Sequence, residues 1–191
     1  MITKKGIILL MALLLLGEGI FCVVLADHNE YKERKRYQKR YRNSSEHDAK
    51  SHLKPADNPT YKEICGECHF AYQPELLPSG SWERILAGLT DHFGEEIEID
   101  QESKKIISEY LKANSAEYSS AKRSVKVMRS LRGQTPIRIT DVPYIRHKHE
   151  DDDIPADAFT RKSVGSMSNC IACHTTAENG IYDDDNVVIP K

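Results

Sequence analysis

Cysteine is scarce in this chain, and it is unevenly distributed. Only five of the 191 residues are cysteines. Four of them lie in two copies of one pattern, CGECH at 65–69 and CIACH at 170–174. The fifth, Cys22, lies in an apolar segment near the N-terminus. Any chemistry that cysteine performs in the rest of the chain therefore falls to these two motifs.

Each cysteine pair is followed directly by a histidine, His69 or His174. The pattern C-x-x-C-H is the attachment signature of c-type haem. Each thiol adds across one vinyl group of the haem, and the histidine binds the iron. The sequence therefore predicts two covalently bound haem c groups, with these two histidines as proximal iron ligands. The predicted thioether residues are Cys65, Cys68, Cys170 and Cys173.

Two other kinds of site could use the same cysteines. The two pairs could together form a zinc site with four cysteine ligands, or one pair could be a thioredoxin-like dithiol. Both alternatives leave the repeated histidine unexplained. The pairs are also about a hundred residues apart, whereas zinc ribbons space them by roughly 15–20. These points favour haem.

The sequence also lacks a long uninterrupted apolar run. Two lysines precede the apolar residues 7–16, Glu18 follows, and a second apolar stretch ends at Ala26. Residues 24–26 resemble a signal-peptidase site, with small residues at −3 and −1, and Glu18 disfavours a permanent transmembrane span. We predict that residues 1–26 are a signal peptide, with an uncleaved anchor as the alternative. The protein would then be periplasmic, or tethered to the membrane, outside which haem is attached.

Residues 27–56 have almost no aliphatic side chains but many basic ones, interleaved with tyrosines. Such a segment cannot bury enough apolar surface to offset the entropy lost on ordering. We predict a basic flexible linker. Contact with anionic lipid headgroups or nucleic acid is conceivable, but a solvated tether is the simpler interpretation. We expect no nucleic-acid partner and at most weak membrane contact.

From residue 57 the sequence indicates a mostly α-helical fold in two haem lobes, 57–117 and 118–191. A short helix over 59–68 would deliver the first motif. A second helix is predicted over 81–93, because apolar residues recur there at helical spacing, with His92 at the edge of its apolar stripe and Gly94 as its C-cap. A third helix should start near Asp100, a good N-cap.

The second lobe has less regular structure. Residues 134–144 contain two prolines and indicate a loop or an edge strand. Ser168 or Asn169 would cap the short helix that carries the second motif. A lobe of about 70 residues with so few aliphatic side chains is marginal alone, so covalent haem would supply much of its apolar core.

The two irons need sixth ligands, and few candidates exist. A filled sixth position favours electron transfer, whereas an open one permits oxygen or peroxide chemistry. Outside the motifs and the N-terminal segments, the candidates are His92, His147, His149, Met128 and Met167. A lone histidine is often only a core or surface residue, but here two irons need partners. Met167 lies only three residues before the second motif and is a poor distal ligand for its own haem.

We therefore expect His92 to be the distal ligand of the first haem and His149 that of the second. His147 is the alternative at the second haem, and Met128 is the main fallback. Two strong-field ligands would keep each iron six-coordinate in both oxidation states.

Five stretches resemble one family, the small two-lobed dihaem cytochromes c of bacteria. They are ICGECHFAYQPELLPSGSW, LTDHFG, EYLKANSAE, the RITDVPYIRHKHE region and SNCIACHTTAENGIY. The resemblance implies a periplasmic electron carrier with low-spin, bis-histidine haems. It also implies an N-terminal lobe like a class I cytochrome c and a smaller, irregular C-terminal lobe.

The resemblance extends to ligands and partners. The family's distal histidines fall on His92 and His149, with His147 as a neighbouring candidate. The implied partners are a small oxygen-binding monohaem cytochrome and a membrane cytochrome b. The predicted function is thus an electron carrier and not an enzyme. The alternatives are a small dihaem peroxidase or reductase, and a haem-based gas sensor with one displaceable ligand.

Overall fold

The computed structural model describes residues 31–39, 52–150 and 154–191. The predicted signal peptide and most of the predicted linker lie outside these residues. The chain divides into two compact units, residues 1–48 and 49–191. No helix within the described ranges is long and apolar enough to cross a membrane.

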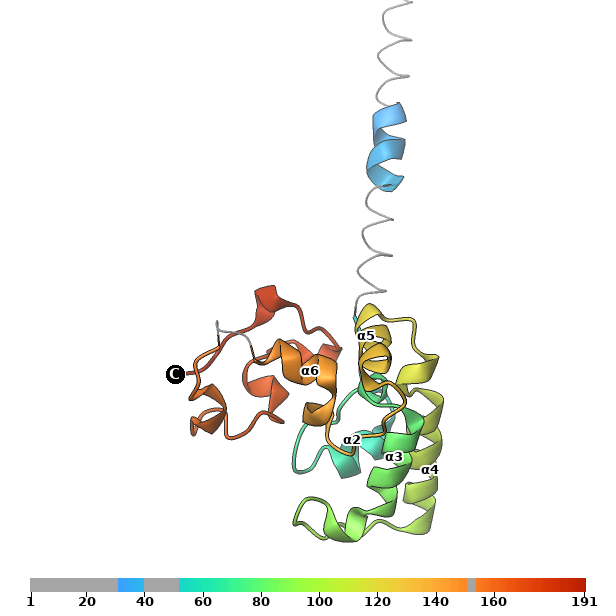
Figure 1. Cartoon of the computed structure of the whole chain (residues 1–191). Coiled ribbons are helices and arrows are strands. Elements are labelled where there is room, and N and C mark those ends of the chain that lie inside the picture. The colour runs from blue at the N-terminus through green and yellow to red at the C-terminus, as the bar shows by residue number, and fades with distance from the viewer. Residues whose placement is uncertain (1–30, 40–51, 151–153) are drawn as a thin grey trace, which may run out of the picture. The chain divides into compact units, whose positions relative to one another are not determined.

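In the first unit, residues 31–39 form a helix in which every residue is exposed (Figure 1). We had predicted a flexible linker here. The segment is rich in lysine, arginine, glutamate and glutamine, which favour helix formation without a buried face. The Lys35 ammonium lies 4.7 Å from the centre of the Tyr31 ring, one turn away.

The second unit is built from helices, and its described residues form no β-strand. The α-helices are α2 (Pro59–Cys65), α3 (Ser79–Ala87), α4 (Gln101–Ala113), α5 (Lys122–Leu131) and α6 (Pro143–Lys148). Four single 3₁₀ turns lie between them, and four more follow α6. They are η1 (Pro74–Leu76), η2 (Leu89–Asp91), η3 (Ala116–Tyr118), η4 (Ile139–Asp141), η5 (Ala158–Thr160), η6 (Cys170–Ala172), η7 (Ala177–Asn179) and η8 (Asp184–Asn186). The predicted fold class, mostly α, is confirmed.

Two helix starts follow from capping residues. The Asp100 carboxylate accepts a hydrogen bond from the Ser103 amide at 2.9 Å and caps α4, as predicted. The Asn58 side chain caps α2 in the same way, by accepting from the Tyr61 amide at 2.9 Å. Pro59, the first residue of α2, has no amide hydrogen to leave unpaired.

The predicted second helix is too long. α3 ends at Ala87, where the Gly88 amide donates to the carbonyls of Arg84 and Ile85. His92 follows η2 and lies in a loop instead of on a helix edge. The loop closes when the Asp91 side chain accepts from the amide of Gly94, whose φ of +100° favours glycine. Gly94 therefore shapes the turn after His92 and does not cap the helix.

The first core lies between α2, α3, α4 and α5, and its buried members are Ala56, Tyr61, Leu77, Trp82, Leu86, Leu89, Ile107, Leu111, Val127, Leu131 and Val142. Val127 and Leu131 lie one turn apart on α5, so they share one buried face. We had assigned α5 to the second lobe, which we began at residue 118. The first core instead continues to Val142.

A second core brings residues near both ends of the unit together with residues from its interior: Leu53, Phe70, Leu76, Ala121, Ala177 and Tyr182. The Leu53 amide donates to the Gly180 carbonyl at 3.0 Å. A Cβ at position 180 would lie 2.0 Å from the Leu53 oxygen, so the approach requires glycine. Leu53 is buried, and the folded unit therefore begins before residue 57, the boundary that we predicted. In Figure 1, α6 lies between the C-terminal segment, coloured orange to red, and the helices α3 and α4.

Candidate cofactor sites

Each C-x-x-C-H motif lines a cavity in the second unit. The first cavity has a volume of about 300 Å³, and its walls include Cys65, Cys68, His69 and His92. The second has a volume of about 380 Å³, and its walls include Cys170, Cys173, His174 and His149. Burial raises the pKa of the thiols of Cys65 and Cys170 to about 11, which shows how apolar their surroundings are.

At the first cavity, two histidines face each other. The ring centres of His69 and His92 lie 6.4 Å apart, and the ring planes are inclined by 26°. The Nδ1 atom of His69 lies 2.9 Å from the Phe70 carbonyl oxygen, which can only accept a hydrogen bond. Nδ1 therefore carries the proton, and Nε2 is left free to bind a metal.

At the second cavity, the ring centres of His149 and His174 lie 6.0 Å apart, with planes inclined by 75°. His149 is the C-cap residue of α6, and its Nδ1 atom lies 2.8 Å from the Ile145 carbonyl oxygen. The same reasoning leaves Nε2 of His149 as the ligand atom. Nδ1 of His174 is buried without a hydrogen-bond partner among the described residues.

Two of these histidines, His92 and His174, have a lowered pKa, which suits metal binding because a ligating imidazole must be neutral. Burial lowers the pKa of His92, and His69 and Arg138 lower it further. Burial likewise lowers the pKa of His174, with smaller effects from His149 and Arg123.

The histidine separations provide a test of whether a haem fits. Two imidazoles that bind one metal from opposite sides need metal–nitrogen bonds of about 2.0 Å each, and with about 1.1 Å from nitrogen to ring centre their centres lie about 6.2 Å apart. The separations of the two histidine pairs in the structure, 6.4 and 6.0 Å, are close to this value. A cysteine pair lines each cavity beside its histidines, so the residues present fit a covalently attached haem.

The other predicted candidates lie differently. His147 is exposed on α6, two residues before His149. Met128 packs against the first core and contributes to the wall of neither cavity. Met167 lines the second cavity on the approach to its own motif. The first three residues of the second motif form η6 in place of the predicted helix, and the Asn169 side chain makes no capping hydrogen bond there.

Aromatic side chains that sequence reasoning missed contact three of the histidines. The Tyr72 ring centre lies 4.8 Å from that of His69, and the Tyr182 ring centre lies 5.4 Å from that of His174. Phe159 packs 5.9 Å from His149. Only Tyr72, three residues after the first motif, carried a local signal in the sequence.

Each cavity also has one arginine in its wall. The Arg138 guanidinium lies 3.8 Å over the Phe93 ring at the first cavity, and that of Arg123 lies 5.3 Å over Tyr182 at the second. These cations are suited to compensate negative groups on a bound cofactor.

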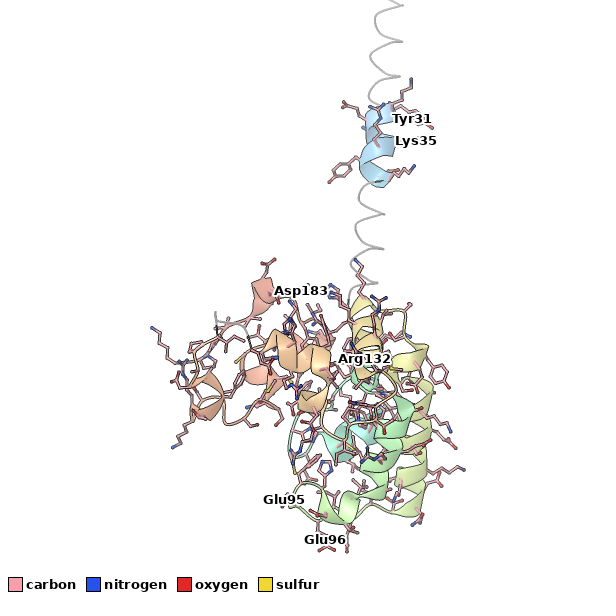
Figure 2. The ribbon with its side chains drawn as sticks, viewed as in Figure 1. Tyr31, Lys35, Glu95, Glu96, Arg132 and Asp183 are labelled. Carbon is pink, nitrogen blue, oxygen red and sulfur yellow. The ribbon has the colours of Figure 1, made fainter. Side chains whose placement is uncertain are left out.

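Acidic side chains lie in the sequence close after both sites. Glu95 and Glu96 follow His92, and Asp183 follows Tyr182; Figure 2 shows the two glutamates far from Asp183 on the second unit.

Comparisons with known proteins find matches over the region that holds both motifs. The family model described as dihaem cytochrome c matches residues 61–182, which include both motifs. A diheme cytochrome c from Rhodobacter sphaeroides is 36% identical, with a TM-score of 0.60, and the match covers 69% of this chain and 100% of that chain. A second structure of a protein purified from Rhodobacter sphaeroides is 35% identical, with a TM-score of 0.53 over 67% and 99% of the two chains.

A diheme cytochrome type c from Shewanella baltica is 36% identical, with a TM-score of 0.57, and the match covers 70% of this chain and 93% of that chain. No curated protein in the comparison matches this chain. The similar structures are matched over nearly their whole length, so the likeness extends over both lobes.

Proposed function

This chain belongs to the dihaem cytochrome c family, and from that premise we propose that it relays single electrons between redox partners through two low-spin, bis-histidine haems. The chain carries two covalently bound haem c groups, as the family implies. We assign the thioethers to Cys65 and Cys68, and to Cys170 and Cys173, with His69 and His174 as proximal ligands. His92 and His149 are the proposed distal ligands.

The separations of the two histidine pairs support this proposal most directly. At 6.4 and 6.0 Å between ring centres, each pair leaves room for one iron and for no additional ligand. An iron held in this way has no open position for oxygen or peroxide. This favours electron transfer over catalysis.

The chain's own residues would keep the sites rigid. When bound, each haem would supply one-electron redox chemistry through the ferrous and ferric states of its iron. The carbonyls of Phe70 and Ile145 hold His69 and His149 in one tautomer and one orientation, so the ligands need little rearrangement. Because histidine pairs lack the methionine that raises the potential, we expect low reduction potentials.

Location and partners are also part of the proposal. Residues 1–26 would direct export to the periplasm, as a cleaved signal peptide or as an anchor. The oxygen-binding monohaem cytochrome and the membrane cytochrome b are carried over from the family resemblance as the proposed partners.

An EPR spectrum of the oxidised protein tests the ligation. We expect two low-spin signals and no high-spin signal, and no rapid carbon monoxide binding after reduction. The two signals should differ, because ring planes inclined by 26° separate the energies of the iron d orbitals more than planes inclined by 75°. A high-spin signal in the unmodified protein would contradict the proposed electron-carrier function. It would favour a function as a peroxidase, a reductase or a gas sensor.

Three substitutions assign the ligands. His92→Ala and His149→Ala should each convert one of the two haems to a high-spin form that binds carbon monoxide, and each should remove a different low-spin signal. His147→Ala is the matched control on the same helix and should leave both haems low-spin. A high-spin haem in His147→Ala, with none in His149→Ala, would move the second distal ligand to His147.

A further inference from the structure

The segment from Tyr72 to Pro74 runs between the two cofactor sites, and its backbone is fixed to the first core. The Tyr61 hydroxyl donates to the Tyr72 carbonyl at 2.8 Å, and the Trp82 indole donates to the Pro74 carbonyl at 2.9 Å. Both donors are buried in that core. The side chains of this segment therefore start from a fixed position.

The Tyr72 side chain contacts both sites at once. Its ring lies against His69, with 4.8 Å between ring centres and 34° between planes. Its hydroxyl donates to the Ser168 carbonyl at 2.6 Å. The same carbonyl accepts from the Cys170 amide at 3.0 Å, so Tyr72 reaches the first residue of the second motif through one shared acceptor.

The Gln73 side chain points to the second site alone. It is fully buried, and its Nε2 donates to the Ala177 carbonyl at 2.6 Å. Its Oε1 accepts from the Tyr182 hydroxyl at 2.6 Å. A buried amide is costly unless it is hydrogen-bonded, and these partners from the C-terminal segment satisfy both of its ends.

Tyr182 completes the connection. It is buried in the second core, and its ring packs edge-on against His174 with 5.4 Å between ring centres. A continuous series of contacts thus joins the two proximal histidines, in the order His69, Tyr72, Gln73, Tyr182, His174. Two consecutive residues of the chain form its centre.

We propose that Tyr72 and Gln73 are positioning residues that fix the two proximal histidines relative to each other. This inference rests on the proposed bis-histidine function. Its consequence is that a change in the middle of the series alters the environment of both irons, although Gln73 touches neither histidine. A role confined to packing would lower stability and leave both iron environments as they are.

The decisive measurement is the paramagnetic NMR spectrum of the oxidised holoprotein, in which the shifts of the haem methyl protons report each iron environment separately. Gln73→Leu keeps the approximate size and removes both hydrogen bonds, so it should shift the methyl resonances of both haems. Tyr72→Phe keeps the ring against His69 and removes only the hydroxyl, so it should shift mainly those of the second haem.

Tyr182→Phe is a milder variant that covers the case in which Gln73→Leu fails to fold. It keeps the ring against His174 and removes only the hydrogen bond to Gln73, and we expect it to shift the resonances of the second haem. Tyr118→Phe, at a tyrosine that is 69% exposed, is the control and should shift neither.

Unchanged methyl resonances in all three test variants, together with a lower melting temperature, would overturn the proposal and leave Tyr72 and Gln73 with a packing role only. Failure of the proposed function is separable, because it would appear as a high-spin signal in the unmodified protein.

Discussion

The two haem sites share a motif but rest on different scaffolds. The first lies among four α-helices around a continuous apolar core. The second lies between α6 and residues 154–191, a described segment in which the only regular elements are 3₁₀ turns. Few of its apolar side chains are buried: Ala158, Val164, Ala177 and Tyr182. The first site is thus supported by protein packing, and we expect the second to depend more on its bound cofactor.

Removal of the cysteine pairs should expose this difference most strongly. Cys170→Ala with Cys173→Ala should abolish most amide protection in residues 154–191, because the haem supplies the apolar surface that this segment lacks. Cys65→Ala with Cys68→Ala should leave α3, α4 and α5 largely protected. Hydrogen exchange followed by mass spectrometry measures the amide protection of each segment in both variants. Equal loss of protection in the two variants would show that the lobes depend on haem to the same extent.

A matched pair of valines compares the packing of the two regions. Val127 on α5 and Val164 in the C-terminal segment are both buried, and each Val→Ala change removes the same atoms. The transfer contribution is about 1.6 kcal/mol in each case. The rigid first core should add a cavity cost, giving about 2–3 kcal/mol for Val127→Ala.

At Val164 the surrounding turns can collapse onto the space, so the loss should stay near the transfer value of about 1.6 kcal/mol. Urea unfolding of the two holoproteins measures both losses. A larger loss at Val164 would contradict the view that the second region is the more adaptable one.

The smallest expected effect is at the start of α4. Asp100→Ala removes an exposed cap of the first scaffold and should destabilise the protein less than Val127→Ala does. Hydrogen bonds from Ser103 lower the pKa of Asp100 below its usual 3.8. Because the folded-state pKa is the lower one, the stabilisation is present above the unfolded pKa and is lost as pH falls through the folded pKa.

Thermal unfolding of the two proteins, measured at several pH values, follows this difference. The variant and the parent should converge in stability at acid pH. A difference that persists below the folded pKa would mean that the aspartate does not act as a charged cap.

Much of the chemistry could be predicted from the sequence, because it depends on local patterns. The two C-x-x-C-H motifs indicated two covalent haems, and the family match confirms that cofactor. Asp100 indicated the start of α4. At the second site, the structure adds a reason to prefer His149 over His147 as the candidate distal ligand. His149 is half-buried, and its Nδ1 is hydrogen-bonded to the Ile145 carbonyl, whereas His147 is exposed.

The features that were missed depend on contacts far apart in the chain. Helical periodicity extended the predicted helix through His92, whereas Gly88 ends it. Gln73 is an unremarkable polar residue until Ala177 and Tyr182 surround it, more than a hundred positions later. The predicted boundary between the lobes, at residue 118, was also misplaced. The sequence of α5 shows that the helix has an apolar face, but it does not show which of the two cores that face packs against.

The contact between Leu53 and Gly180 has a consequence for how the protein folds. The beginning of this fold waits for a partner that lies 127 positions further along the chain. Such long-range closure slows folding, because the chain loses conformational entropy before the contact between the distant segments stabilises it. We therefore expect the second core, which includes Leu53, to be completed only when Gly180 reaches it.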